Sequence, residues 1–130
     1  MIYEVSSRRV AIDKRGNDKA ITEHFLVNDT ELFAEAESAV LDIYNGENDV
    51  IAVKRSAVSE VINKRTEDEQ KIFVANIERS DIEGKVTKVS VALFASNITE
   101  ANKISHDYIA KAVVDETVVE VKKSKFLDLI

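Results

Sequence analysis

The composition of this 130-residue chain is typical of a soluble globular protein. Its formal net charge is -6, with 32% charged and 45% hydrophobic residues, and this balance opposes non-specific attraction to nucleic-acid phosphates. The chain has no cysteine, which excludes a thiol nucleophile and a cysteine-ligated zinc site and fits a reducing cytoplasm. Its first residues alternate like a strand, and no stretch is free of charge over the length of a membrane span. The sequence therefore predicts neither export nor membrane insertion.

Two pairs of alternating stretches, each pair separated by a turn that contains a glycine, predict two β-hairpins. Such alternation places apolar side chains on one face of a sheet and polar side chains on the other. The stretches span residues 2–12 and 20–27 in the first hairpin, and 72–80 and 86–95 in the second.

A helix is predicted after each hairpin, because apolar residues recur there at spacings of three and four. The first helix has Asp29 or Thr30 as its expected N-cap, and Gly46 is expected to end it. The second helix is expected to begin at Asn97, with Glu100 three residues later in the pattern of a capping box.

The third strand that follows each helix shows an internal repeat most clearly. Residues 50–56 are echoed by residues 118–124 in residue class and in order. We therefore predict an α+β protein that is one domain built by tandem duplication of a β-β-α-β unit: a first copy at 1–62, a charged linker at 63–70 and a second copy at 71–130. The strands are expected to form a mixed, mostly antiparallel sheet with the two helices packed on it. Two arrangements stay open, one sheet of six strands or two sheets packed about a pseudo-two-fold axis.

Three stretches of the first copy, at residues 2–27, 33–37 and 53–61, resemble a family of small proteins from Bacteroidetes and their phages that is described only as a domain of unknown function. The resemblance is weaker in the second copy. It implies a shared duplicated fold and a bacterial or phage origin, and it brings no catalytic residues with it.

No recognisable catalytic motif occurs in the sequence. The two histidines, His24 and His106, lack the short helical spacing of paired metal ligands. Three separated glycines cannot form a phosphate-binding loop, and no serine stands in a glycine-flanked nucleophile turn. We therefore expect a protein that is not an enzyme and that has neither a metal site nor a cofactor.

Basic residues stand at matching places in the two copies of this acidic chain. Lys54 and Arg55 end the third strand of the first copy, Lys122 and Lys123 end that of the second, and Arg9 stands late in the first strand. One interpretation is that they are solvated strand ends that discourage edge-to-edge pairing. The other is an anion-binding rim, in which arginine grips phosphate or carboxylate through its fork and lysine adds a point charge. The five residues are the candidate ligand site.

The last residues of the sequence are unusually apolar. We expect Phe126, Leu127, Leu129 and Ile130 to dock onto the core and also to contribute to a contact between subunits.

Together these features predict a non-catalytic, phage-associated binding protein that sequesters a small anionic ligand of nucleotide type. It would act as a homo-oligomer in the cytoplasm of a bacterial host, and the link to phages suggests a role against host defence. The alternative is a protein–protein interaction module that inhibits or scaffolds a host or phage protein through a sheet edge. Nucleic-acid binding is the weakest interpretation, because it needs a continuous basic face with stacking aromatic residues.

Overall fold

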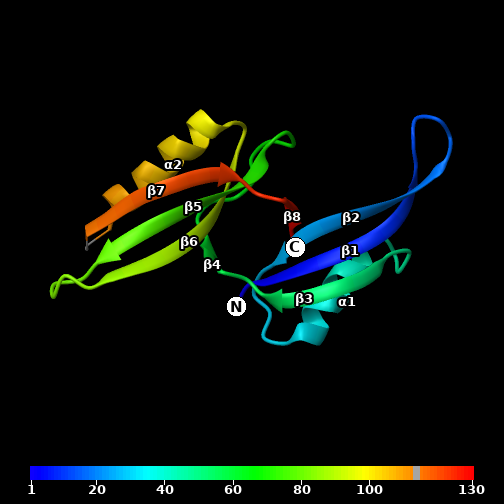
Figure 1. Cartoon of the computed structure of the whole chain (residues 1–130), viewed down its shortest axis with the longest axis horizontal. Coiled ribbons are helices and arrows are strands. Elements are labelled where there is room, and N and C mark those ends of the chain that lie inside the picture. The colour runs from blue at the N-terminus through cyan, green and yellow to red at the C-terminus, as the bar shows by residue number, and fades with distance from the viewer. Residues whose placement is uncertain (113–114) are drawn as a thin grey trace. The chain divides into compact units, whose positions relative to one another are not determined.

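The computed structural model describes residues 1–112 and 115–130 and confirms the α+β class. The strands form two separate four-stranded sheets, not one sheet of six strands (Figure 1). The strand orders are β3-β1-β2-β8 and β4-β6-β5-β7. In chain order the elements are β1 (Tyr3–Ile12), β2 (Asp18–Val27), α1 (Phe33–Ile43), β3 (Asp49–Arg55), β4 (Val58–Val61), β5 (Lys71–Ser80), β6 (Val86–Ala95), α2 (Ile98–Ala110), β7 (Asp115–Lys123) and β8 (Phe126–Leu129).

The chain divides into two compact units, each built around one sheet. Unit 1 comprises Met1–Ser56 together with Phe126–Ile130, and unit 2 comprises Ala57–Lys125. The expectation of a single domain stays a prediction.

Each sheet is centred on one of the predicted hairpins. β1 pairs with β2 in the antiparallel sense along the full length of both strands, and β5 pairs with β6 in the same way. The turns use Gly16 and Gly84, whose φ angles of 79° and 82° are readily adopted only by glycine. The alternation of apolar and polar residues therefore predicts both hairpins correctly.

The third strand of each unit carries a β-bulge at the same place. β3 pairs with β1 and β7 pairs with β5, both antiparallel, and an extra residue interrupts each register, Ile51 in β3 and Val119 in β7. Beyond the bulge Val53 lies opposite Val5, as Val121 lies opposite Ala75. The repeated sequence positions thus occupy equivalent strand positions, while a common origin of the two units remains an inference from the sequence.

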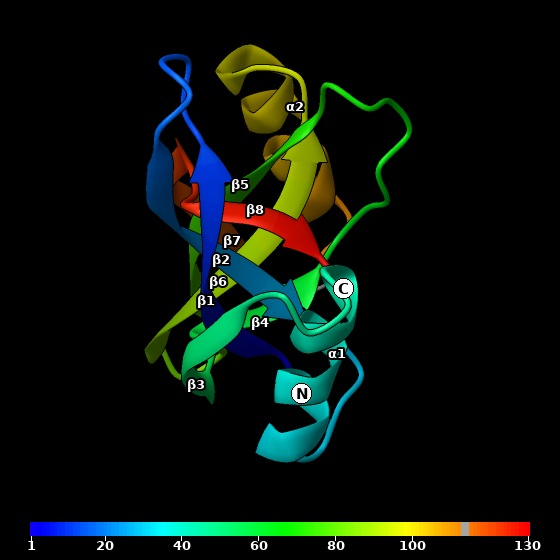
Figure 2. The same cartoon turned by 90° about the vertical axis from the view of Figure 1, so that its right-hand side faces the viewer.

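Two short strands were not predicted, and each completes a sheet through parallel pairing. β8 pairs with β2 in unit 1, and β4 pairs with β6 in unit 2 (Figure 2). Residues 57–62, which the repeat groups with the first copy, therefore lie in unit 2, and residues 126–130 lie in unit 1. Parallel partners are joined by long connections, so no local pattern reveals which strand they will join.

The start of α1 differs from the prediction. Its N-cap is Leu32, and no side chain caps the helix there. Thr30, one of the two expected caps, instead donates a hydrogen bond from its hydroxyl to the Glu35 carboxylate at 2.7 Å. Asp29, the other candidate, lies further upstream with a positive φ of 55°. The helix thus begins later than Asp29 or Thr30 would place it, because Thr30 binds a side chain of the first turn and not a backbone amide.

The start of α2 and the end of α1 agree with the sequence. The Asn97 side chain caps α2 by accepting a hydrogen bond from the backbone N–H of Glu100 at 2.9 Å. After α1, the backbone N–H of Gly46 donates to the carbonyl of Leu41 at 2.8 Å, and Gly46 adopts a φ of 81°. This left-handed glycine satisfies a free carbonyl at the helix end.

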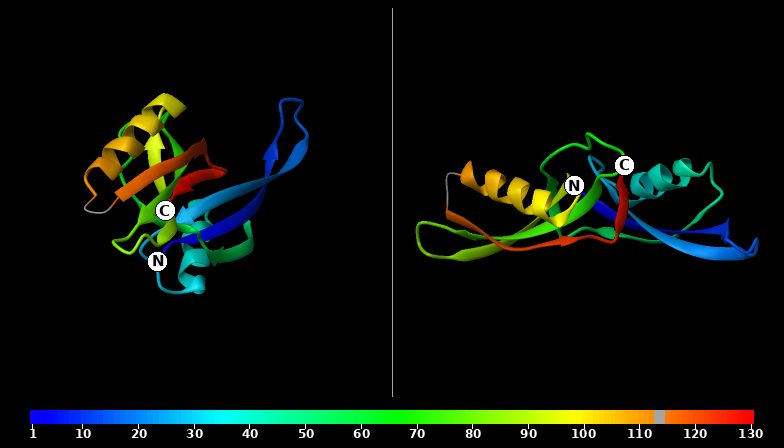
Figure 3. Two further views of the ribbon diagram at one scale, coloured as in Figure 1. Left: turned by 60° about the vertical axis from the view of Figure 1, so that its left-hand side comes forward. Right: turned by 90° about the horizontal axis from the view of Figure 1, so that it is seen from above.

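In each unit the helix lies over one face of the sheet (Figure 3). A hydrophobic core fills the space between them. Fully buried alanines, Ala36 in α1 and Ala101 in α2, leave the room that lets each helix lie close to the strands. No helix within the described residues is long and apolar enough to cross a membrane. The core of unit 1 contains Tyr3, Val5, Phe25, Val27, Ala36 and Val40, and that of unit 2 contains Phe73, Ala75, Ile77, Val91, Leu93, Ala95 and Ala101.

Asn63 extends the pairing of β4 with β6 beyond the end of β4. Its amide oxygen accepts from the backbone N–H of Phe94 at 2.7 Å, and its amide nitrogen donates to the Phe94 carbonyl at 2.9 Å. Because Phe94 is buried, Asn63→Ala leaves both backbone groups without their partner and should lower the free energy of unfolding by about 1–3 kcal/mol. Urea denaturation measures this. The control Asn102→Ala, on the exposed face of α2, should change stability by no more than about 0.5 kcal/mol, and an equal effect of both changes would contradict the role of Asn63.

Candidate functional site

The predicted basic rim is not assembled within unit 1. Arg55 lies opposite Tyr3 at one end of β1, whereas Arg9 stands six residues further along that strand, about 20 Å away at the rise of an extended chain. The Lys54 ammonium lies 3.9 Å from the Glu4 carboxylate. Arg9 therefore does not share a ligand with Lys54 and Arg55.

Lys122 and Lys123 occupy the equivalent end of β7 in unit 2. The Lys122 ammonium lies 3.7 Å from a carboxylate oxygen of Glu120, and both side chains are more than half exposed. Lys123 lies opposite Phe73 in the register of β5 and β7. Each basic pair thus ends its own edge strand, and a rim formed by both pairs stays a prediction.

The apolar residues of the last strand join the edge of the unit 1 sheet, and their docking onto the core stays a prediction. Phe126 pairs with His24 and Leu129 with Leu26, and the backbone N–H of Ile130 donates to the Leu26 carbonyl at 2.8 Å. Leu127 and Ile130 remain 52% and 39% exposed. A contact between subunits through Phe126, Leu127, Leu129 and Ile130 stays a prediction.

Arg9 belongs to a polar cluster near the end of α1. Its Nε donates to Oε1 of Glu23 at 2.7 Å, and the hydroxyl of Tyr44 donates to the same oxygen at 2.8 Å. The guanidinium also lies over the Tyr44 ring, 4.8 Å from its centre. Because its fork is already occupied by a carboxylate, Arg9 fixes the helix end to the sheet and is poorly placed to hold an anion.

The ionisation of this cluster follows from its hydrogen bonds. Burial would raise the pKa of Glu23, but the hydrogen bonds from Arg9 and Tyr44 outweigh burial and hold the pKa below its ordinary value of 4.5. Burial, with the neighbouring Glu23 carboxylate, raises the pKa of Tyr44. Hydrogen bonding to Glu23 raises the pKa of Arg9. The cluster is therefore an ion pair with a neutral phenol at neutral pH.

Unit 2 has a similar cluster built from different residues. Nε of Arg79 lies 2.5 Å from Oε1 of Glu116, whose side chain is only 4% exposed. The hydroxyl of Tyr108 in α2 donates to Glu60 in β4, and this hydrogen bond is the main cause that raises the pKa of Tyr108. The two clusters join different strands, since Glu23 lies in β2 whereas Glu116 lies in β7 and Glu60 in β4. In both units, however, a tyrosine near the end of the helix donates to a glutamate of the sheet, so we assign both clusters a structural role at the helix ends.

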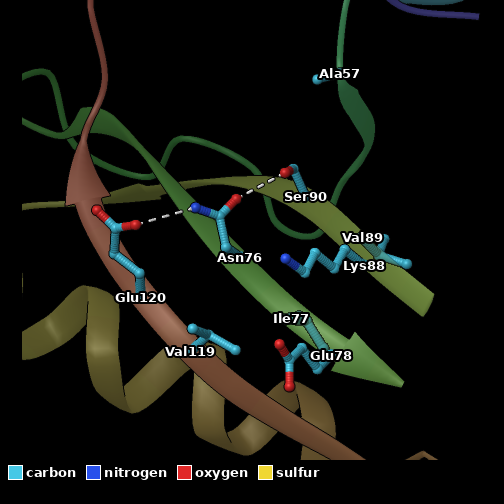
Figure 4. Close-up of a pocket in the computed structure, with 9 residues that line it drawn as sticks. All are labelled: Ala57, Asn76, Ile77, Glu78, Lys88, Val89, Ser90, Val119 and Glu120. Atoms are coloured by element: carbon cyan, nitrogen blue, oxygen red, sulfur yellow. Dashed lines mark hydrogen bonds between the residues drawn. The ribbon is translucent and has the colours of Figure 1, made fainter. Parts of the chain in front are cut away.

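A trough on the helix-free face of the unit 2 sheet is the candidate site. It has a volume of about 390 Å³, which lies in the usual range of small-molecule pockets. Figure 4 shows polar side chains from three neighbouring strands within it. The residues that line the trough are Ala57, Asn76, Ile77, Glu78, Lys88, Val89, Ser90, Val119 and Glu120.

Asn76 of β5 forms the centre of the trough. The Ser90 hydroxyl, from β6, donates to the Asn76 amide oxygen at 2.7 Å, and the Asn76 amide nitrogen donates to Glu120 of β7 at 3.3 Å (Figure 4). These two bonds fix the orientation of the amide group. They leave one N–H and one oxygen lone pair of Asn76 for a ligand.

The neighbouring row of the trough holds two charges that do not pair. Glu78 and Lys88 are directly opposite in the register of β5 and β6, where opposite charges usually attract each other. Within the part of the chain that the structure describes, neither side chain makes an ion pair or a side-chain hydrogen bond, and Figure 4 shows their charged ends apart. Val119, the bulged residue of β7, adds an apolar side chain that is 58% exposed.

The sequence did not single out these residues, although one signal was present. Asn76 and Glu78 alternate with core residues in β5, as Lys88 and Ser90 do in β6, so all four share the helix-free face. Such alternation is common on solvated sheet faces, and the partner strand that brings Glu120 beside Asn76 is distant in sequence.

These observations define the class of protein: a small α+β chain of two units with similar sheets, one of which carries a polar trough. The described residues contain no group of three or more histidine and carboxylate side chains that could hold a metal ion. The chain belongs to the family described as "Domain of unknown function (DUF4494)", whose model matches residues 1–130. The expected resemblance to a family of unknown function is thereby confirmed. No curated protein matches the sequence.

Because the pKa of Glu23 is lowered in the folded protein, the free energy of unfolding should depend on pH. A carboxylate whose pKa is lower in the folded state stabilises the protein above pH 4.5, and this contribution is lost as pH falls through the folded pKa. The wild type should therefore be more stable than Glu23→Gln at pH 7, and the difference should shrink from about pH 4.5 downward. Denaturation between pH 7 and pH 3 checks this, with Glu37→Gln on the exposed face of α1 as control. A difference that is the same at both ends of the range would contradict it.

Proposed function

We propose that the chain is a non-catalytic binding protein that holds a small molecule in the trough of unit 2. The supporting observation is the Asn76 amide, which is fixed on both sides by Ser90 and Glu120 and still has hydrogen-bonding capacity. A side chain oriented in this way loses little freedom when it binds a ligand, so it favours a preformed site.

The arrangement of the trough further supports a small ligand. Its groups come from three adjacent strands of one sheet, which are more rigid supports than loops. Lys88 and Glu78 supply free charges, and Val119 supplies an apolar contact. A few polar groups beside apolar surface are the usual composition of a ligand pocket.

We propose further that binding serves to sequester the ligand, in the cytoplasm of a bacterial host or during phage infection. The lack of cysteine fits a reducing cytoplasm, and the resemblance seen in residues 2–27, 33–37 and 53–61 suggests the bacterial or phage origin. Self-association, as the sequence predicts, would multiply the number of troughs in each particle. A protein that binds a host or phage protein through a sheet edge is the alternative.

Native mass spectrometry of the intact protein, purified from bacterial cells, tests the proposed trough. The wild type should retain a small molecule that is released on denaturation. Asn76→Leu keeps a side chain of similar size but removes the fixed amide, so the retained fraction should fall at least about tenfold, as expected for the loss of about 1.4 kcal/mol or more.

The matched control is Ser6→Ala, because Ser6 stands opposite His24 in unit 1 as Asn76 stands opposite Ser90 in unit 2. This variant should retain the ligand like the wild type. Equal loss in both variants would place the ligand outside the trough, and a wild type without any retained molecule would remove the support for sequestration.

A further inference from the structure

The charges of the trough are unlike those of the predicted basic rim. Its charged side chains are the carboxylates of Glu78 and Glu120 and the ammonium of Lys88, so the lining is net acidic. The chain as a whole has a net charge of -6, which attracts cations from a distance and repels anions. Among the lining residues a nucleotide phosphate would find a single lysine and two carboxylates, of which Glu120 also lies 3.7 Å from the Lys122 ammonium outside the lining.

From this balance we propose that the ligand is a small zwitterion with a guanidinium or amine at one end and a carboxylate at the other. The inference rests on the proposed function, because it names the ligand class of the same trough. The cationic end lies at Glu78 and Glu120, and the anionic end lies at Lys88. Carboxylates bind guanidinium through two parallel hydrogen bonds, which makes such an end especially suitable.

The spacing of the strands agrees with a ligand of this length. Lys88 is on β6 and Glu120 is on β7, with β5 between them and an offset of two residues along the strands, so their backbones are about 12 Å apart at the usual strand separation and rise. The intervening strand contributes Asn76 and Glu78. A short aliphatic chain that crosses the trough connects the two charged ends.

Val119 supplies the surface for that aliphatic chain. The bulge in β7 adds this residue between Val118 and Glu120, and its side chain lines the trough while 58% of it remains exposed. Methylene groups of long charged side chains commonly lie along apolar surface while their charged ends stay in polar surroundings. L-Arginine is the probe that we choose. It has a guanidinium at one end, an aliphatic chain, and a carboxylate at the other end, which there stands beside an α-ammonium.

Calorimetric titration with three probes tests the ligand class. L-Arginine should bind at least about tenfold more tightly than L-citrulline, which has nearly the same shape but a neutral end. It should also bind more tightly than agmatine, which keeps the guanidinium and lacks the carboxylate. Citrulline that binds as tightly as arginine would overturn the proposal.

Two variants and one control test which residues bind the two ends of the ligand. Glu78→Gln should weaken arginine binding about tenfold and leave citrulline binding nearly unchanged. Lys88→Ala should weaken arginine binding by a similar factor but should not weaken agmatine binding, because agmatine has no carboxylate for the lysine and carries at that end an ammonium, which Lys88 repels. Lys71→Ala removes a lysine from the same unit outside the trough and is the control, which should bind all probes like the wild type.

Guanosine monophosphate is included as an anionic probe, together with the double variant Arg55→Ala/Lys123→Ala. If the wild type binds the nucleotide but not arginine, and the double variant no longer binds the nucleotide, the zwitterion proposal would be overturned and the basic rim supported. If the wild type retains a molecule that Asn76→Leu loses, but does not bind arginine, the proposed ligand class would be overturned while the trough would stand as the binding site. The failure of the two proposals can thus be told apart.

Discussion

The parallel pairing of a short strand with each hairpin is the interaction on which the rest of the structure depends. Without β4, the backbone groups of β6 near Ala92 and Phe94, both buried residues, would lack hydrogen-bond partners at the sheet edge. Asn63 continues this pairing with its side chain. β4 therefore fixes one side of the unit 2 sheet, and the residue before it, Ala57, lines the trough. On the other side β7 brings Glu120 to Asn76.

The two units show that one fold can carry different chemistry. By register, Ser6 and Ala52 in unit 1 correspond to Asn76 and Glu120 in unit 2, so the central amide and its carboxylate partner are missing there. Unit 1 also has Arg8 opposite Thr22 where unit 2 has Glu78 opposite Lys88, the pair that lies in the trough. The bulge in the third strand is shared, and each unit has a tyrosine near the helix end that donates to a glutamate of the sheet. The shared features support the fold, and the residues that differ support a specific site in unit 2.

The sequence predicts what depends on local patterns and fails where distant segments meet. Both hairpins, both helices, the Asn97 cap and the Gly46 helix end follow from alternation, spacing and capping chemistry. The sheet that β4 joins does not follow from the sequence, because the alternation of β4 fits either sheet and parallel pairing has no local signal. The predicted grouping of Arg9 with Arg55 also fails for this reason, since the register that separates them is not visible in either segment.

A nuclear magnetic resonance titration of the intact chain with L-arginine tests the trough most directly, because it reports on every backbone amide at once. We predict that the amide signals that shift belong to β5, β6 and β7 around Asn76, Lys88 and Glu120. Signals of Arg9, Arg55 and the rest of unit 1 should stay unchanged. Shifts that centre on the ends of β3 and β7, or no shifts at millimolar arginine, would contradict the site that we propose.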